Sequence, residues 1–263
     1  MAAFSAQDIT RVKGLGFLLN RGTESFSGRV VSPGGVFTAD ELMALAECAK
    51  RFGNGKVIMT TRLAAEVVGI PYDQIEAARS FLAESGLYFG GTGAKVRPVT
   101  ACKGTTCVYG TYDTQALAQE IHDRYYIGWK DVALPHKFKI AVGGCPNSCM
   151  KPSLNDFGIE GHRIPVNNRE EFGADVGYKI YVGGTWGKST RMGTPLSRLV
   201  RQDEIFPLIE KTMLWFKENA YQKERLGAAI DRVGADKLEE ALFGDDLLNR
   251  KEEILAADVK KRP

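Results

Sequence analysis

Residues 143–161 read GGCPNSCMKPSLNDFGIEG and hold two of the five cysteines of the chain, Cys145 and Cys149, with three residues between them. A glycine pair precedes the first thiol and Pro146 follows it. Glycine lets the backbone approach a bulky group closely, and proline stiffens a loop. The stretch therefore predicts a loop that presents two thiols to a common ligand.

A second cysteine pair, Cys102 and Cys107, lies in TACKGTTC with four residues between the thiols. Paired zinc ligands usually have only two intervening residues on a tight turn. An iron–sulfur cluster spreads over several ångströms and takes thiolates from different directions. The spacing favours such a cluster over a zinc site or four unligated thiols. Cys48, inside ELMALAECAKRF, is interpreted as a small buried hydrophobic residue.

The composition is that of an ordinary globular protein: 263 residues, 44% of them hydrophobic and 25% charged, enough for one large or two small domains. The net charge of +3 argues against nucleic acid or an anionic membrane as the main partner. The start, MAAFSAQDITRVKG, lacks the apolar core of a signal peptide, and no apolar run reaches the roughly 18 residues of a membrane span. We expect a cytoplasmic protein. In that reducing compartment, clustered thiols are interpreted first as metal ligands and only then as disulfides.

The chain alternates between expected strands and helices. Residues 26–31 predict a strand, and Thr38 with Glu41 forms a capping box for the next helix. KVIMTT and an apolar run ending at Val68 follow, then a helix over about residues 72–85. This order is typical of a ferredoxin-like half-domain. The second region predicts a helix over about 114–126, strands KFKIAV and YKIYVGG, an amphipathic helix from about 203 to 222 and a charged helical tail.

Basic residues accompany the cysteine motifs. LPHKFKIAVGGC places Lys137 and Lys139 on one face of the strand that leads to Cys145. Two cations on one face are unfavourable unless an anion binds there, although a solvated strand edge is the simpler alternative. Three arginines lie in or beside apolar strand-like stretches, and each alone would be interpreted as a surface residue: Arg29 in SGRVVSPGG, Arg62 in MTTRLAAEV and Arg97 in AKVRPVTAC.

The combination of FSGRVVSPGGVFTADEL, GKVIMTTR, RPVTACKGTTC, LPHKFKIAVGGCPNSC and YKIYVGG resembles the sulfite and nitrite reductase family that carries siroheme coupled to a 4Fe-4S cluster. The resemblance extends over about residues 15–220. It implies an α+β fold: a ferredoxin-like half-domain (1–92), a nitrite/sulfite reductase 4Fe-4S/siroheme α/β domain (93–222) and a helical C-terminal extension (223–263).

The resemblance also implies roles for individual residues. The cluster ligands would be Cys102, Cys107, Cys145 and Cys149, and Cys149 would also bridge to the siroheme iron. The residues facing the bound oxyanion would be Arg29, Arg97, Lys137 and Lys139. Siroheme would be held by Arg62, Asn147 and Cys149, since its eight carboxylates need charge-assisted donors. The loop GGTWGKSTRMGT is interpreted as a glycine-rich turn, with contact of Lys188 and Arg191 to siroheme carboxylates as the alternative.

The implied activity is the six-electron reduction of sulfite to sulfide. The alternatives are reduction of nitrite to ammonia, and a cluster-bearing electron-transfer subunit without siroheme chemistry. Two lysines in the KFK strand resemble the sulfite-reducing branch, whereas ferredoxin-dependent nitrite reductases tend to have an amide at the position of Lys139. A structural zinc protein is a third class. No G-x-G-x-x-G loop or further cysteine cluster is present, so a separate ferredoxin or flavoprotein is expected to deliver electrons.

Two features depart from the family pattern. The first cysteine pair is spaced C-x4-C, where the family commonly has C-x5-C. The chain also contains one module, whereas full-length assimilatory relatives contain two, with the cysteines and several anion-facing cations on different modules. We therefore expect a homodimer with shared active sites, in which the basic residues of one subunit reach the siroheme held by the cysteines of its partner. The three histidines are not expected to bind metal.

Overall fold

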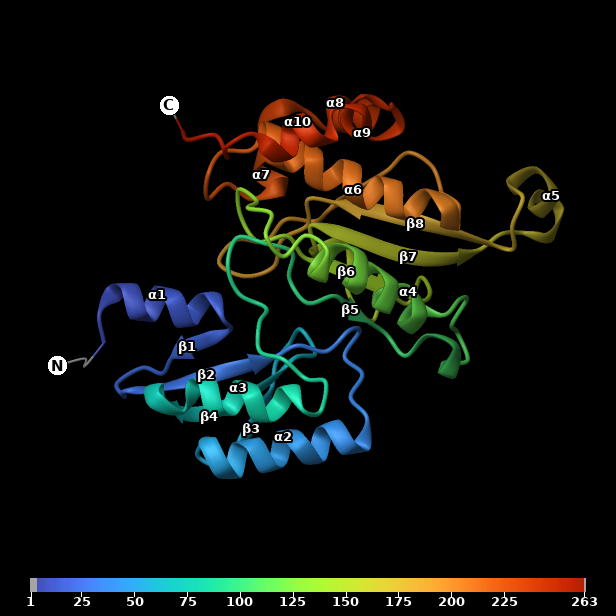
Figure 1. The fold of residues 1–263 in the computed structure, drawn as a ribbon. Helices are drawn as coiled ribbons and strands as arrows, with labels where there is room; N and C mark the ends of the chain where they lie inside the picture. The colour runs from blue at the N-terminus through green and yellow to red at the C-terminus, as the bar shows by residue number, and fades with distance from the viewer. Residues whose placement is uncertain (1–3, 263) are drawn as a thin grey trace. The chain divides into compact units, whose positions relative to one another are not determined.

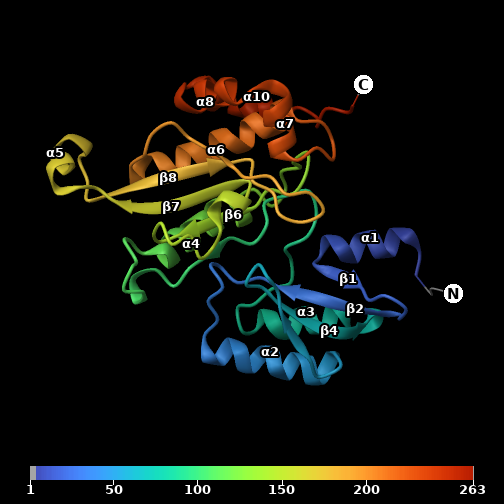
Figure 2. The same cartoon turned by 180° about the vertical axis from the view of Figure 1, so that it is seen from behind.

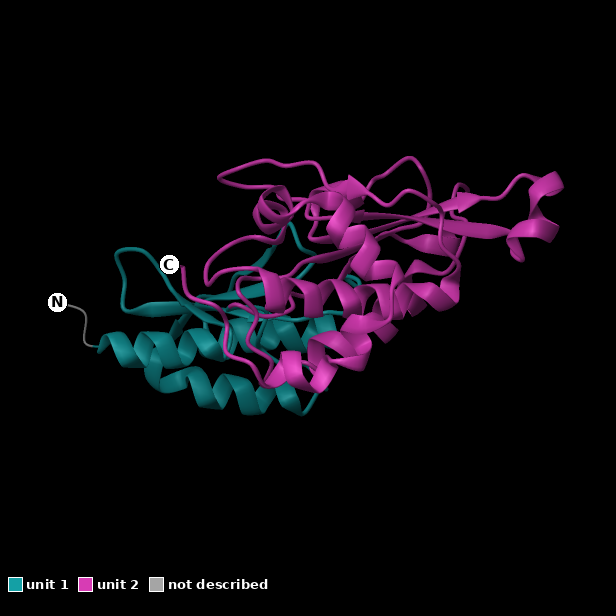
Figure 3. Ribbon diagram, turned by 90° about the horizontal axis from the view of Figure 1, so that it is seen from above, with its two compact units in different colours: residues 1–93 teal, residues 94–263 magenta. Residues whose placement is uncertain are grey.

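The computed structural model of the chain describes residues 4–262, which divide into two compact units at Gly93 (Figure 3). The start of the first predicted domain (residues 1–3) and the last residue of the third lie outside the described part. Within residues 4–262 no helix is both long enough and apolar enough to cross a membrane.

The first unit is built on a four-stranded antiparallel sheet in the order β1-β2-β4-β3. The strands are β1 (Phe17–Leu19), β2 (Ser25–Val30), β3 (Val57–Met59) and β4 (Ala65–Pro71). The helices are α1 (Ala6–Gly14), α2 (Ala39–Phe52) and α3 (Ile75–Ala83), the last preceded by a 3-10 turn, η1 (Tyr72–Gln74). Figure 2 shows α2 and α3 side by side on one face of this sheet, where their apolar sides share its core.

Two details of this unit follow the sequence closely. The capping box at the start of α2 is confirmed: Thr38 Oγ1 accepts the Glu41 N–H at 3.2 Å, and Glu41 Oε2 accepts the Thr38 N–H at 2.7 Å. Cys48 is fully buried in α2, and burial raises the pKa of its thiol to about 11. A thiol that stays protonated at neutral pH is a packing residue, as predicted.

The second unit is built on a five-stranded mixed sheet in the order β5-β6-β7-β8-β9 (Figure 1). Its strands are β5 (Thr100–Ala101), β6 (Ile140–Gly143), β7 (Phe157–Arg163), β8 (Val176–Val182) and β9 (Thr194–Pro195). The first three strands are parallel, and β8 and β9 continue the sheet antiparallel. Because β5 and β6 run parallel, the loops that leave their carboxyl ends emerge at the same edge.

The helical segments of this unit fall into two groups along the chain. Those before β9 are η2 (Gly104–Thr106), α4 (Thr114–Ile121), the π-helical η3 (His122–Ile127), η4 (Pro152–Leu154), η5 (Val166–Asn168) and α5 (Arg169–Phe172). After β9 they are α6 (Gln202–Asn219), α7 (Leu226–Val233), α8 (Ala235–Phe243), α9 (Asp246–Asn249) and α10 (Lys251–Ala256). Figure 1 shows the C-terminal helices gathered on α6, and residues such as Leu226 and Ile254 belong to the same core as the strands. The tail beyond residue 223 is thus part of the second unit.

The strand predicted from KFKIAV is shorter than expected. The regular ladder of β6 starts at Ile140, and before it Phe138 makes only an isolated parallel bridge to Val96. The N–H of Lys139 donates to the side chain of Asp156 at 2.9 Å. A side-chain acceptor therefore replaces the expected strand partner at this position. The sequence also gave no prediction of α1, β1, β7 or β9.

Candidate functional site

The carboxyl ends of β5 and β6 deliver the cysteines to one place. Cys102 directly follows β5, and its N–H donates to Val142 O of β6 at 3.1 Å. Cys145 follows β6 after a single residue. All four predicted ligands, Cys102, Cys107, Cys145 and Cys149, line one cavity of about 460 Å³. The two loops that the sequence singled out thus form a single site.

The tighter C-x4-C loop is accommodated by a 3-10 turn. Gly104 opens this turn with φ +55°, and the N–H of Cys107 closes it on Gly104 O at 3.0 Å. A Cβ at position 104 would lie 2.6 Å from Thr114 Oγ1, so both the left-handed backbone and the packing require glycine. With four intervening residues, Cys102 and Cys107 still border the same cavity.

The second loop holds backbone strain beside its thiols. Ser148 and Lys151 have φ of 53° and 50°, in the left-handed region that non-glycine residues rarely adopt. Each such residue costs on the order of 1 kcal/mol or more and persists only where the surroundings enforce it. The turn is closed by the Ser148 N–H on Cys145 O at 3.1 Å, and Cys149 is left exposed. Strain of this kind is common at ligand sites.

The cavity suits a cluster better than a single ion. Among residues 4–262, no three Cys, His, Asp or Glu side chains converge on one point as a bound ion requires. The Gly144 N–H donates to Cys102 Sγ at 3.2 Å, a contact that stabilises a thiolate. A Cβ at Gly144 would lie 3.2 Å from that sulfur. Four separated thiols, a glycine-lined wall and an N–H···S contact fit a 4Fe-4S cluster.

A group of basic residues lies at the opposite, amino-terminal end of β6. Lys137 and Lys139 flank Phe138, which is fully buried, and the Arg97 N–H donates to Phe138 O at 2.8 Å. Together with His136 and Arg225 these side chains interact electrostatically. We call Arg97, His136, Lys137, Lys139 and Arg225 the basic cluster. The structure thus brings three predicted anion-facing residues together, on a different end of the strand from the thiols.

Crowding of positive charge shifts the pKa values of groups in this cluster. The pKa of Lys137 is lowered from its ordinary value, first by burial and then by Arg225 and Arg97. Burial and the same cations lower the pKa of His136 to about 4. His136 is therefore neutral near pH 7, and its Nδ1 accepts the Lys137 N–H at 2.7 Å. A neutral histidine and a lysine of lowered pKa are expected where an anion is to be received.

The two predicted arginines of the first unit have different settings. Arg29 lies in β2 opposite Glu66 of β4, and its Nε and Nη2 donate to Glu66 Oε1 at 2.9 and 2.6 Å. Its Nη1 donates to Gly91 O at 3.1 Å, so the guanidinium is held rigidly. Arg62 lies in the turn between β3 and β4, next to Leu63 with φ 59°. Their roles toward an oxyanion or siroheme stay predictions.

Of the three other predicted cofactor residues, only Asn147 borders the thiol cavity, and its side chain is exposed. Lys188 is also exposed. Arg191 is engaged within the protein: Nε and Nη2 bond Asp231, Nη1 donates to the carbonyls of residues 183 and 192, and Nη2 also reaches Thr194. This arrangement ties the loop to α7. Contact of Arg191 with a cofactor stays a prediction that would require breaking these bonds.

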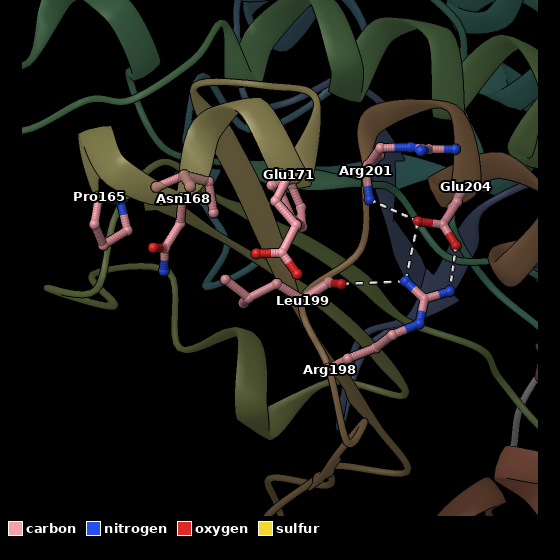
Figure 4. Close-up of a pocket in the computed structure, with 9 residues that line it drawn as sticks. Pro165, Asn168, Glu171, Arg198, Leu199, Arg201 and Glu204 are labelled. Carbon is pink, nitrogen blue, oxygen red and sulfur yellow. Dashed lines mark hydrogen bonds and ion pairs between the residues drawn. The ribbon is translucent and has the colours of Figure 1, made fainter.

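A second cavity, of about 610 Å³, lies elsewhere in the second unit, between the tip of the β7–β8 hairpin and the start of α6 (Figure 4). Arg198 there donates to Glu204 Oε2 at 3.1 Å, and the Arg201 N–H donates to the same carboxylate at 2.8 Å. Figure 4 shows these groups turned toward each other. No thiol lines this cavity, and its arginines are paired with an acid, so the smaller thiol cavity is the better candidate site.

Sequence reasoning missed Arg225 of the basic cluster and its partner Asp156. Arg225 precedes α7, and its Nη2 donates to both carboxylate oxygens of Asp156 at 2.8 Å. Asp156 belongs to the quoted stretch of residues 143–161 but was given no role. Arg225 lies 69 positions further along the chain, in a tail that the sequence predicts only to be helical and charged. No signal in one sequence would have paired them.

Two family profiles match the chain. The profile described as the nitrite/sulfite reductase ferredoxin-like half domain matches residues 20–85, and that of the nitrite and sulphite reductase 4Fe-4S domain matches residues 92–251. The predicted fold, a ferredoxin-like half-domain before a 4Fe-4S domain with C-terminal helices, is confirmed. In solved structures, the Mycobacterium tuberculosis NirA protein aligns with a TM-score of 0.78 at 20% identity, covering 99% of this chain and 49% of that one. Dissimilatory sulfite reductase I aligns with a TM-score of 0.72 at 20% identity, covering 82% and 68%.

Among curated relatives, the coenzyme F420-dependent sulfite reductase of Methanocaldococcus jannaschii is 30% identical, and the match covers 78% of this chain and 40% of the relative. The NAD(P)H nitrite reductase of Emericella nidulans is 29% identical, covering 88% and 20%. The assimilatory-type sulfite reductase of Nitratidesulfovibrio vulgaris is 26% identical, covering 87% and 97%. The chain thus spans less than half of the first two relatives and nearly all of the third.

Proposed function

The chain belongs to the nitrite and sulfite reductase family, and we propose that it reduces sulfite to sulfide with siroheme coupled to a 4Fe-4S cluster. The observation that carries the proposal is the single cavity bordered by Cys102, Cys107, Cys145 and Cys149. The basic cluster in the same unit supports an oxyanion as the substrate. The relatives of similar length include a protein named as an assimilatory-type sulfite reductase.

The four thiols would hold the cluster, and the exposed Cys149 would also serve the siroheme iron. When bound, the coupled pair would pass the donor's electrons to the substrate and supply the iron centre for the reduction. The glycines of residues 143–144 keep side chains away from the cavity wall, so that a cluster can approach the backbone. We propose that Arg62 and Asn147 bind cofactor carboxylates, and that a separate ferredoxin or flavoprotein delivers the electrons.

The basic cluster would bind the oxyanion and supply protons. Arg97 and Lys139 provide positive charge where negative charge develops as bonds to oxygen break. Lys137 is the best proton donor of the group, since burial and two neighbouring arginines lower its pKa toward the working range of an enzyme. Arg29, oriented by Glu66, would add a further cation, as the resemblance implies.

Shared active sites in a homodimer are supported by the two ends of β6. Lys139 precedes the strand and Cys145 follows it, so that the four residues of β6 separate the lysine end from the thiol end by about 13 Å. The cations and thiols of one subunit therefore lie at opposite ends of β6. A two-fold dimer would bring the lysine end of each subunit to the thiol end of its partner and form two equivalent sites.

A visible spectrum of anaerobically purified protein tests the cofactor assignment. Siroheme gives strong Soret and red-region bands, a lone 4Fe-4S cluster gives a broad brown shoulder, and zinc gives neither. Iron and acid-labile sulfide would be measured on the same sample. Protein that binds a cluster without siroheme would support the electron-transfer alternative, and turnover with an artificial donor would compare sulfite with nitrite.

A further inference from the structure

Asp156 is a buried acid in the middle of the basic cluster. It directly precedes β7, and its side chain is 0% exposed. Its carboxylate accepts the Arg225 Nη2 at 2.8 Å on both oxygens and the Lys139 N–H at 2.9 Å on Oδ2. An unpaired buried carboxylate would be strongly destabilising. Asp156 therefore needs its ion pair with Arg225 and its hydrogen bond from the Lys139 N–H to remain charged in the interior.

Asp156 and the residue after it fix the backbone of Lys139 from two sides. The Lys139 N–H donates to Asp156 Oδ2, and Lys139 O accepts the Phe157 N–H at 3.0 Å. Residues 156 and 157 therefore hold both the N–H and the carbonyl of Lys139 by hydrogen bonds. Because Phe138 is fully buried next to it, the lysine side chain has little freedom to change its direction.

The C-terminal tail reaches the cluster at a second point. Lys223, with φ 68°, donates its N–H to Pro135 O at 2.9 Å. The Arg225 side chain is 16% exposed, and its Nε is buried without a hydrogen-bond partner in the described structure. The turn before α7 is thus anchored to both ends of the segment from residue 135 to 139. A surface tail would need neither a strained residue nor a buried guanidinium.

We infer that the Asp156–Arg225 pair is a positioning device of the anion site: it fixes the backbone of Lys139 and balances the charge around the side chain of Lys137. The inference rests on the proposed function for its meaning in catalysis. The geometry and the charge balance can be tested on their own. Asp156 and Arg225 touch no reacting atom and act through the two lysines.

The two members of the pair act on Lys137 with opposite sign. Arg225 lowers the pKa of Lys137 and Asp156 raises it. Around these groups stand Arg97, which also lowers the pKa, and Lys139 and His136 on the same segment. Removing the acid should therefore lower the pKa of Lys137 further, and removing the arginine should raise it. A pair with only a structural role would give shifts of the same sign, since either change would loosen the same segment.

The experiment measures the pKa of Lys137 in the full-length protein by competitive labelling. Trace acetic anhydride is added over a range of pH, and acylation of each lysine is quantified by peptide mass spectrometry. Asp156→Asn is expected to lower the pKa of Lys137 relative to wild type, and Arg225→Gln to raise it. Arg225→Lys retains the charge and is expected to restore a value near wild type. Far-UV circular dichroism verifies that each variant is folded.

The matched control is Arg232→Gln. Arg232 lies on α7 and pairs with Glu224, whose side chain is 4% exposed, so this change also leaves a buried acid unpaired. It is expected to leave the pKa of Lys137 unchanged. Shifts of equal sign in Asp156→Asn and Arg225→Gln would overturn the inference, as would an equal shift in Arg232→Gln. If Arg225→Gln does not fold, Asp156→Asn and Arg225→Lys still test the inference. An unchanged pKa of Lys137 in Asp156→Asn would contradict it.

The kinetics of sulfite reduction test whether the pair matters for catalysis. With Lys139 misplaced, kcat is expected to fall about 10-fold to 100-fold in Asp156→Asn, while Arg225→Lys keeps most of the turnover. Lysine shifts of the expected sign in protein that never shows siroheme bands would support the pair and refute the proposed function. The reverse result, full siroheme and turnover with unshifted lysines, would refute the pair alone.

Discussion

The opposite placement of the lysines and thiols on β6 predicts that two inactive variants restore each other. Lys137→Ala/Lys139→Ala removes the cations and leaves the cysteines. Cys149→Ser removes a thiol and leaves the cations. Co-expressed in equal amounts with different affinity tags, the two chains form mixed dimers, in which one site takes thiols from the first chain and lysines from the second.

The expected activity follows from this geometry. Random association makes about half of the dimers mixed, and one of the two sites in each mixed dimer is intact, so that activity per chain is about one quarter of wild type. If each subunit formed its own site, every site would carry one of the defects. The mixture would then be as inactive as its parents. Restored activity is the expected outcome, because β6 separates its two ends by about 13 Å.

The assay is sulfite reduction with an artificial donor, on dimers purified through both tags in sequence. The control carries all three substitutions in one chain and is co-expressed with wild type. In these doubly purified dimers, shared sites give the complementing pair about one half of the full rate and leave the control inactive, whereas independent sites leave the pair inactive and give the control about one half. Doubly purified mixed dimers without activity, but with normal siroheme content in the lysine-substituted chain, would refute the shared site.

The remaining predictions concern single residues of the second unit. Lys139→Asn should reduce sulfite turnover about 100-fold and nitrite turnover much less; equal losses would contradict the assignment to sulfite. Gly144→Ala puts a Cβ 3.2 Å from Cys102 Sγ and should lower iron and sulfide content, whereas Gly14→Ala, with no atom within 4 Å of the new Cβ, should not. Because the protonated form of Lys137 is the proposed donor and its pKa is lowered from 10.5, turnover should fall as pH rises through a value below 10.5; a fall only at or above pH 10.5 would count against Lys137. Arg191→Gln should lower the free energy of unfolding by about 1–2 kcal/mol through lost hydrogen bonds, with siroheme per folded chain unchanged, and a loss of siroheme would instead place Arg191 at the cofactor.

The fold could be predicted where local signals agree with tertiary packing. The Thr38–Glu41 capping box and the apolar side of α2 are examples, and both are confirmed. The missed strand β7 shows the opposite case. Its sequence FGIEGHR contains two glycines and a buried Glu160, none of them typical of strands. The glycines are needed because a Cβ at 158 or 161 would lie 2.2 or 2.4 Å from Pro152 O or Thr111 Oγ1.

The part of the site that depends on the spacing of residues in the sequence was predictable. Four cysteines in two pairs predict a common ligand, and the structure places all four around one cavity. Asp156 and Arg225 are ordinary residues whose importance arises only from contact across 69 positions. Arg29 was predicted to face an oxyanion, yet its ion pair with Glu66 comes from the cross-strand register of β2 and β4, which the sequence does not reveal.

The motif LPHKFKIAVGGC shows why proximity in sequence was a poor guide to proximity in space. Lysines a few residues before a metal loop suggest one constellation, but an extended strand carries each residue about 3.3 Å further from the last. The continuity of the motif therefore places the lysines and the thiols of one chain at opposite ends of β6. In the proposed dimer, strand β6 sets the distance between the lysines at one end and the thiols at the other. The contacts of Asp156 with the Lys139 N–H and with Arg225 hold the lysine end in place. In the proposed dimer, the lysine end of one copy and the thiol end of the other copy form one active site.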